Sequence, residues 1–169
     1  MADELVDIVD DRNQVTGQMM KTEAHRLGAL HRCVVSHVID SEGNWILVKQ
    51  ADDRQDAGQF VSPVGGHVGA GESDDEALKR EAMEELGITA VNFKRLGRAV
   101  FNREVIGRKE NHLFSLYEIY TDEQPTLNHE SVGVEKFTLP QIKQELKDTP
   151  KKFGDAFHYV IRHFYPELL

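Results

Sequence analysis

One stretch of the chain, residues 66–88, constrains its fold more than any other: GHVGAGESDDEALKREAMEELGI. Residues 73–76, Ser-Asp-Asp-Glu, have the pattern of a helix capping box, and helix-compatible sequence then runs to Leu86 before Gly87 stops it. The stretch therefore predicts a glycine-rich loop followed by a helix. That helix has an apolar stripe that can dock on a sheet, formed by Leu78, Ala82 and Leu86.

Three glutamates share another face of the same helix. Glu81, Glu84 and Glu85 stand at i, i+3 and i+4, so at about 100° per residue their carboxylates form one stripe. Like charges at these spacings destabilise an isolated helix by roughly 0.2–0.5 kcal/mol per pair. A divalent cation such as Mg²⁺ or Mn²⁺ removes this repulsion and can also bind phosphate oxygens. A solvated acidic face is the alternative interpretation of three glutamates alone.

The neighbouring residues favour the cation site over the solvated face. Glu72 lies eight positions before Arg80 and could pair with it, holding the glycine loop against the carboxylates. Gly65 and Gly66 let the backbone pass close to a metal ion and offer it the Gly66 carbonyl. The segment thus predicts a bound cation rather than a solvated helix face.

The rest of the chain alternates between extended and helical patterns, which predicts a single mixed sheet covered by helices. Short helices are expected at 22–27, with Thr22 as N-cap, and at 140–146. We expect one domain over residues 1–169, with an N-terminal hairpin at about 4–21 and a C-terminal helix at about 152–165 as decorations. Strands are predicted at 33–39, 45–48, 91–101, 113–120 and 132–137.

Composition and charge narrow the class of protein. The chain carries 20 Lys and Arg against 29 Asp and Glu, a net charge of −9, and so repels duplex nucleic acid. No apolar run approaches the roughly 20 residues that span a bilayer, and the acidic first residues are unlike a signal peptide. The single cysteine, Cys33, fits a reducing compartment. We therefore predict a cytoplasmic protein without a membrane or duplex partner; a homodimer is expected only because such assemblies are common.

The stretch around the helix matches the pattern G-x5-E-x7-R-E-U-x-E-E-x-G-U, in which U is an apolar residue. This pattern is the Nudix box, and the chain resembles the Nudix hydrolase superfamily. Such a resemblance implies an α/β fold, the Nudix α/β/α sandwich with a mixed sheet and a loop-helix-loop catalytic motif. The box is filled here by Gly66, Glu72, Arg80, Glu81, Ala82, Glu84, Glu85, Gly87 and Ile88.

The Nudix resemblance also implies a reaction. It implies cleavage of a phosphoanhydride bond in a nucleoside diphosphate linked to another moiety, a small phosphorylated substrate. One or more Mg²⁺ or Mn²⁺ ions, held by Glu81, Glu84 and Glu85 with Gly66, would activate a water molecule that attacks phosphorus. Catalytic roles fall to Arg80 and to Glu84 or Glu85 as the base. The family also recruits bases from outside the box, for which Glu104 and Glu110 are candidates.

A second resemblance covers the flanking sequence. The histidines of AHRLGALHR, the Gly-Gly-His that ends at His67, and Glu110-Asn111-His112 are similar to isopentenyl-diphosphate isomerase, a Nudix-fold enzyme that binds a metal ion with such residues. Two positions depart from its pattern, because Gly65 replaces the catalytic cysteine and His112 replaces the second glutamate. We therefore expect a hydrolase of the isomerase-like branch. An isomerase is the second hypothesis, and a nucleotide-binding module without turnover is the third.

The histidines raise a separate possibility. If the four side chains converge, their imidazoles would suit a transition metal such as Zn²⁺ or Mn²⁺ better than Mg²⁺. The alternative is that each histidine makes its own hydrogen bond at the end of a strand. The candidate ligands of this second metal site are His25, His31, His67 and His112.

Overall fold

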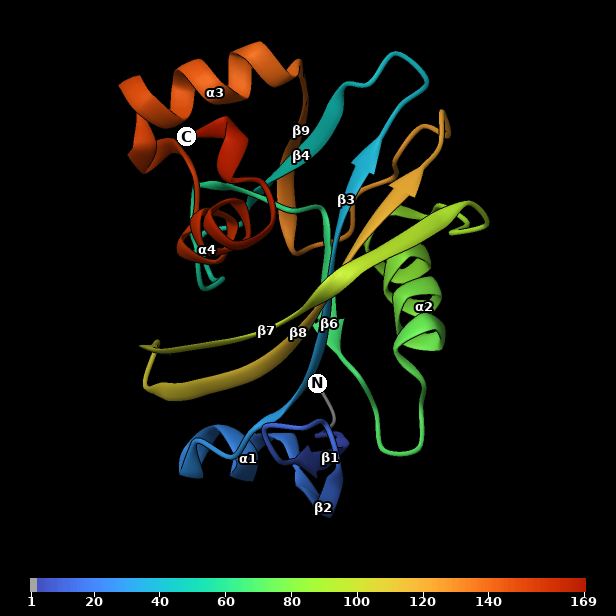
Figure 1. Ribbon diagram of the computed structural model, residues 1–169, viewed down its shortest axis with the longest axis vertical. Coiled ribbons are helices and arrows are strands. Elements are labelled where there is room, and N and C mark those ends of the chain that lie inside the picture. The colour runs from blue at the N-terminus through green and yellow to red at the C-terminus, as the bar shows by residue number, and fades with distance from the viewer. Residues whose placement is uncertain (1–2) are drawn as a thin grey trace.

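The computed structural model describes residues 3–169, which fold into a mixed sheet with helices on both faces (Figure 1). The helices are α1 (Lys21–Leu27), α2 (Asp74–Leu86), α3 (Leu139–Asp148) and α4 (Asp155–Phe164), with 3-10 turns at Pro150–Lys152 and Pro166–Leu168. The strands are β1 (Leu5–Val9), β2 (Val15–Met20), β3 (His31–Ile39), β4 (Trp45–Gln50), β5 (Phe60–Val61), β6 (Val64–His67), β7 (Phe93–Val105), β8 (Arg108–Tyr120) and β9 (Ser131–Phe137).

Strand β3 organises the sheet. It runs parallel to β8 along its whole length, from His31 opposite His112 to Ile39 opposite Tyr120. It is antiparallel to β6 on its other side, and it also pairs with β1 and, at its far end, with β4. Strand β8 continues into a long antiparallel hairpin with β7, and β4 pairs with β5 and β9. This arrangement places β3, β6 and β8 side by side where the polar residues gather.

Two apolar cores hold the helices on the sheet. One core lies between the sheet and α2, which buries Leu78, Ala82 and Leu86 there, as their spacing predicts. The other core contains buried residues of α3 and α4 together with Trp45 and Phe114 of the sheet. Figure 1 shows α2 on one side of the strands and α3 with α4 on the other. The predicted α/β/α sandwich with a mixed sheet is therefore confirmed.

The predicted helix of the glycine-rich stretch is present. The Ser73 hydroxyl accepts a hydrogen bond from the Glu76 backbone and the Glu76 side chain accepts one from the Ser73 backbone, which completes the capping box. Gly87 ends the helix with φ +63°, a left-handed conformation that glycine adopts easily. Helix α2 is thus fixed at both ends by residues within the same short stretch.

Two details of the expected helices are wrong. Helix α1 begins at Lys21 with Met20 as N-cap, and the Thr22 hydroxyl donates to Asp3 instead of capping. The expected helix at 152–165 is shorter, because Phe153 lies outside α4 and Gly154 precedes its first residue. The chain before α4 is extended instead, because Phe153 bridges to Phe60 of β5 and the N–H of Gly154 donates to the Phe60 carbonyl at 3.0 Å.

The strands also differ from the expected ranges. Strands β7 and β8 extend to Val105 and Arg108, so their hairpin is longer than the apolar pattern predicts, and Gly107 lies in the turn between them with φ +76°. The glycine-rich stretch begins as strand β6, because Gly65, Gly66 and His67 pair with β3. Among residues 3–169, no helix is long and apolar enough to cross a membrane.

Candidate active site and histidine cluster

A cavity of about 380 Å³ opens where β6 meets α2. Helix α2 contributes Glu81, Glu84 and Glu85 to its wall, and β6 contributes Gly65 and Gly66. Further parts of the wall come from β3, β4, β8, α4, the β7–β8 hairpin and the loops before β5 and β9. The three carboxylates that the sequence places on one helix stripe therefore face one cavity.

The backbone of β6 passes close to two of these carboxylates. A Cβ added to Gly66 would lie 2.2 Å from the carboxyl carbon of Glu81, so no side chain larger than hydrogen fits there. The N–H of Gly65 donates to Glu85 at 3.2 Å. Glu84 is less constrained, because its side chain is 56% exposed and its ion pair with Arg80 is long, at 3.4 Å. The glycines thus allow the carboxylates and the strand backbone to share one small space.

Burial makes these carboxylates costly to ionise. Burial raises the pKa of Glu81 to about 7, although Arg80 opposes this change. The pKa of Glu85 is raised well above its usual value, first by burial and then by the charges of Glu81 and Glu130. A divalent cation would replace the protons that such a cluster otherwise retains. The residues present therefore fit a hard cation with oxygen ligands.

Arg80 supports the loop and does not contact the cavity. Its guanidinium donates to both oxygens of Glu72 at 2.8 and 2.9 Å, to the His67 carbonyl at 2.9 Å, and to Glu81 at 2.7 Å. The predicted Glu72–Arg80 pair is thus present. Glu72 also accepts the N–H of Gly69 at 3.0 Å, which ties the loop to the pair. The expected catalytic role of Arg80 is therefore better described as positioning Glu81.

Neither glutamate expected from outside the box is placed as a base. Glu110 lies in the cavity wall, but Arg103 donates to it at 2.8 Å and Arg108 at 3.0 Å. Although burial opposes the change, these arginines and His112 lower the pKa of Glu110 to about 2. Glu104 is exposed opposite Lys109 in the hairpin and does not line the cavity. In the β7–β8 hairpin, Glu110 is thus neutralised by two arginines and Glu104 lies outside the cavity wall.

Glu130 is a cavity residue that the sequence analysis missed. It precedes β9 and lines the cavity together with Arg54, whose guanidinium contacts it at 2.7 Å. A single glutamate before a strand has no distinctive pattern. Only the folding of the β9 loop against α2 brings it to the other carboxylates.

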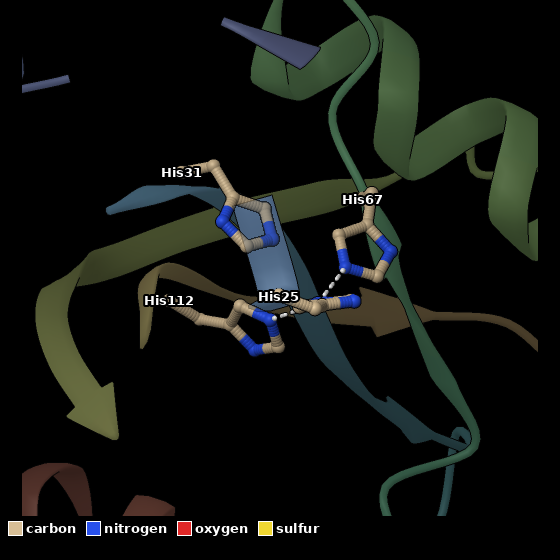
Figure 2. Close-up of side chains that lie close together, drawn as sticks. All are labelled: His25, His31, His67 and His112. Carbon is tan, nitrogen blue, oxygen red and sulfur yellow. Dashed lines mark hydrogen bonds between the residues drawn. The ribbon is translucent and has the colours of Figure 1, made fainter. Parts of the chain in front are cut away.

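The four histidines converge beside the carboxylate cavity. His25 lies on α1, His31 on β3, His67 on β6 and His112 on β8. One nitrogen from each ring lies within 4.8 Å of the others. Figure 2 shows His25 between two partners, with Nε2–Nε2 distances of 3.2 Å to His67 and 3.2 Å to His112. The histidines therefore form one cluster instead of separate contacts at strand ends.

Within residues 3–169, the Nε2 of His31 has no hydrogen-bond partner. The Nδ1 of His31 lies 2.8 Å from the Ala29 carbonyl, which can only accept, so Nδ1 carries the proton. Its Nε2 then has a free lone pair, and this atom is buried without a hydrogen bond. A backbone bond at one nitrogen with the other left free is typical of a metal-ligating histidine.

Burial also keeps the cluster neutral. It lowers the pKa of His25 to about 4 and that of His112 to about 3, and it lowers the pKa values of His31 and His67. Neutral imidazoles are the form that binds transition metals. The nearest expected carboxylate ligand, Glu110, is held by two arginines, so the donor set consists of nitrogens. This set fits Zn²⁺ or Mn²⁺ better than Mg²⁺.

Three comparisons relate the chain to known proteins. The Nudix domain family matches residues 29–157. The chain is 43% identical over 96 residues to an uncharacterised Nudix hydrolase of Streptomyces coelicolor, a match that spans 53% of this chain and only 50% of that protein. It is 28% identical over 155 residues to an isopentenyl-diphosphate Δ-isomerase of Pectobacterium atrosepticum, covering 89% of this chain and 85% of the relative.

A solved structure agrees with these matches. The crystal structure of DR0079 from Deinococcus radiodurans has a TM-score of 0.75 at 26% identity, covering 96% of this chain and 99% of that one. Because the family match covers most of the chain, the protein belongs to the Nudix family. The Nudix resemblance in the box is confirmed, and so is the likeness of the flanking sequence to isopentenyl-diphosphate isomerases.

Proposed function

We propose that this Nudix protein is a metal-dependent pyrophosphohydrolase that cleaves a phosphoanhydride bond in a nucleoside diphosphate linked to another moiety. One observation carries the proposal: Glu81, Glu84 and Glu85 face a single cavity beside the side-chain-free backbone of Gly66. The Nudix hydrolases among its relatives support the reaction class. The cavity is large enough for a small phosphorylated molecule.

The roles of the three glutamates follow from how firmly each side chain is held. Glu81 and Glu85, fixed against β6, would hold Mg²⁺ or Mn²⁺ together with the Gly66 carbonyl. When bound, the cation supplies charge neutralisation at the diphosphate and lowers the pKa of a water molecule. Glu84, the most exposed of the three, is free to orient the attacking water and accept its proton. Arg80 keeps Glu81 in place through its bonds to Glu72 and His67.

A substrate screen with matched variants tests this proposal. Nucleoside diphosphate sugars, dinucleotides and nucleoside triphosphates are incubated with Mg²⁺, and the products of phosphoanhydride cleavage are separated and quantified. Glu85→Gln should reduce hydrolysis at least about 100-fold with an unchanged circular dichroism spectrum. Glu104→Gln, on the exposed hairpin, is the control and should retain full activity. Absence of turnover across the panel would favour the binding module, and full activity in Glu85→Gln would remove that residue from the mechanism.

We also propose that the four histidines hold a transition-metal ion. The unpartnered Nε2 of His31 and the neutral state of the rings support this second site. Metal analysis of protein purified without chelator should find close to one Zn²⁺ or Mn²⁺ per chain. The His31→Ala variant should lose that ion. Metal-free wild-type protein that also fails to take up Zn²⁺ would contradict the site.

Isomerisation of a prenyl diphosphate is the second candidate function. It is favoured by the isomerase relatives and by the histidine cluster in the region that resembles them. Gly65 stands where the isomerases have their catalytic cysteine, and it has no side chain that could transfer a proton. The one cysteine of the chain, Cys33, is no substitute, because burial raises the pKa of its thiol well above its usual value. Isopentenyl diphosphate should therefore not incorporate deuterium from heavy water in the presence of the protein. Exchange at an enzymatic rate would reverse the order of the two candidates.

A further inference from the structure

The turn that joins β7 and β8 contains a residue that is unusual for its conformation. Val105 pairs with Arg108, so Ile106 and Gly107 form a two-residue hairpin turn. Both have a positive φ, +45° for Ile106 and +76° for Gly107, as a type I′ turn requires. Such turns favour the pair Asn-Gly, whereas a β-branched residue with a positive φ is strained. Ile106 therefore lowers the stability of the hairpin.

Burial does not offset the strain at Ile106, because its side chain is 64% exposed. The residue instead lines the cavity into which the glutamates of α2 point. Backbone strain is found mostly at sites of function, where a local preference is overridden for the sake of a contact. A strained, exposed isoleucine in a cavity wall thus points to contact with a bound molecule.

Ion pairs fix the hairpin close to this turn. Arg103 of β7 donates to Glu110 of β8 at 2.8 Å and to Asp56, in the loop before β5, at 2.9 Å. Its Nη1 also lies 3.7 Å from a carboxylate oxygen of Asp155, the first residue of α4. Arg103 and Asp56 both line the cavity, and their side chains are only 14% and 6% exposed. The turn with Ile106 is therefore held at a fixed place in the cavity wall.

The cavity extends from the carboxylates of α2 to this turn, since both line it. Figure 1 shows the hairpin as a long arm whose turn lies well away from α2. Phosphate groups bound through a cation at Glu81 and Glu85 would lie at the α2 end. The two arginines of the hairpin that line the cavity, Arg103 and Arg108, are already paired with Glu110. The turn therefore presents an apolar side chain to the part of the substrate beyond its phosphates.

We propose that Ile106 is a specificity-determining residue whose side chain contacts an apolar face of the group attached to the diphosphate. The inference rests on the proposed function, because it assumes that Glu81, Glu84 and Glu85 hold the phosphates through a cation. A nucleobase and a hydrocarbon chain both offer such a face, and the experiment distinguishes them. The competing interpretation is that Ile106 only forms the turn.

Binding of diphosphate analogues that resist hydrolysis separates these interpretations. Calorimetry in Mg²⁺ compares methylenediphosphonate, which has no organic group beyond its two phosphorus atoms, with the α,β-methylene analogues of ADP and of isopentenyl diphosphate. The wild type should bind one of these two organic analogues at least about tenfold more tightly than methylenediphosphonate. Ile106→Asn should reduce that preference at least about fivefold and leave the affinity for methylenediphosphonate unchanged. The analogue that loses affinity identifies the group as a nucleobase or a hydrocarbon.

Two control variants and melting curves complete the test. Ile106→Val keeps a branched apolar side chain and should keep most of the preference. Val91→Asn makes the matched change at an exposed position outside the cavity wall and should bind all three analogues as the wild type does. Because the pair Asn-Gly favours a type I′ turn, Ile106→Asn should raise Tm by about 2–4 °C. The variant is thus expected to gain stability while it loses selectivity.

Several outcomes would overturn the proposal. A raised Tm with an unchanged preference in Ile106→Asn would show that the residue only forms the turn. A lowered Tm would show that the isoleucine does not strain the hairpin, and a loss of methylenediphosphonate binding would place the effect at the phosphates. Equal affinity of the wild type for all three analogues would also overturn it. A wild type that binds none of them in Mg²⁺ would instead refute the cation centre of the proposed function, and this inference with it.

Discussion

Two polar clusters meet at adjacent positions of β6, and they are built in opposite ways. The carboxylate cluster beside Gly66 takes three acidic side chains from a single helix, and these repel one another once they are ionised. The histidine cluster around His67 takes one side chain from each of α1, β3, β6 and β8, and burial keeps its rings neutral. A cation would neutralise the carboxylates of the first cluster. In the second cluster it would be coordinated by neutral imidazole nitrogens that already face one another.

The two clusters are also held in place by different contacts. Carboxylates that repel one another need a cationic side chain to hold them in place. The Arg80 guanidinium does this, because it binds both Glu72 and Glu81. Neutral rings need no counterion and are oriented by packing and by one backbone bond, from His31 to Ala29. The clusters should therefore respond differently to substitution, to metal ions and to pH.

The largest effect is expected at Gly66. In Gly66→Ala the new Cβ must displace the Glu81 carboxylate, which it would otherwise approach at 2.2 Å. A displacement of about 1 Å at a catalytic site can cost about 100-fold in rate, so phosphate release should fall by at least that factor. Gly69→Ala is the control, since its Cβ would lie 3.6 Å from Glu72. Equal rates in the two variants would show that Glu81 is not a ligand.

Zn²⁺ should stabilise the protein by binding to the histidine cluster and not to the carboxylates. At about 100 times its Kd, Zn²⁺ should stabilise the protein by about 2.7 kcal/mol, which raises Tm by roughly 5–10 °C for a chain of this size. His112→Gln should remove most of this increase, and Gly66→Ala should keep it. His163→Gln, exposed and outside the cluster, is the control. A Tm increase that survives in His112→Gln would place the zinc elsewhere.

In metal-free protein, the two clusters should make the free energy of unfolding depend on pH in opposite directions. The pKa of Glu81 is raised from 4.5 to about 7 in the folded protein, so its contribution to stability is present below pH 4.5 and is lost as the pH rises to 7. The pKa of His112 is lowered from 6.5 to about 3, so stability is lost as the pH falls from 6.5 to 3.

Urea unfolding of the metal-free protein across this range measures both slopes. Glu81→Gln should flatten the loss between pH 4.5 and 7, and His112→Gln should flatten the loss between pH 6.5 and 3. The Glu81 slope should also disappear when Mg²⁺ is added, because the cation replaces the proton. Identical pH profiles in all three proteins would contradict this account of the clusters.

The smallest effect is expected at an isolated histidine that belongs to neither cluster. His37 stacks on Trp45 with ring centroids 4.1 Å apart, and both of its nitrogens are buried without a partner in the described part of the chain, residues 3–169. His37→Phe removes these unsatisfied atoms and should raise the free energy of unfolding by about 1 kcal/mol. Burial lowers the pKa of His37 to about 3, so the gain should grow as the pH falls below 6.5. Zinc binding should be unchanged, whereas a loss of stability would mean that a ring nitrogen has a partner in solution.

The carboxylate cluster could be predicted in detail because its geometry is local. Spacing along α2 places the three glutamates on one face, and the capping residues Ser73 and Gly87 fix where that helix begins and ends. The convergence of the four histidines was only one of two open interpretations of the sequence, because the positions span residues 25–112 and follow no helical or strand period. Glu130 was not predicted, since nothing in its own segment links it to the box.

The family, the helix of the box and the Glu72–Arg80 pair could all be predicted from the sequence, because short-range spacing and side-chain chemistry specify them. The packing of distant segments, by contrast, lets Arg103 and Arg108 neutralise Glu110 and places Glu130 in the cavity, where Arg54 pairs with it. The physical reason is that ion pairs depend on distances across the sheet and between loops. Those distances are set by β3, β6 and β8 packing together, and separation along the chain does not encode them.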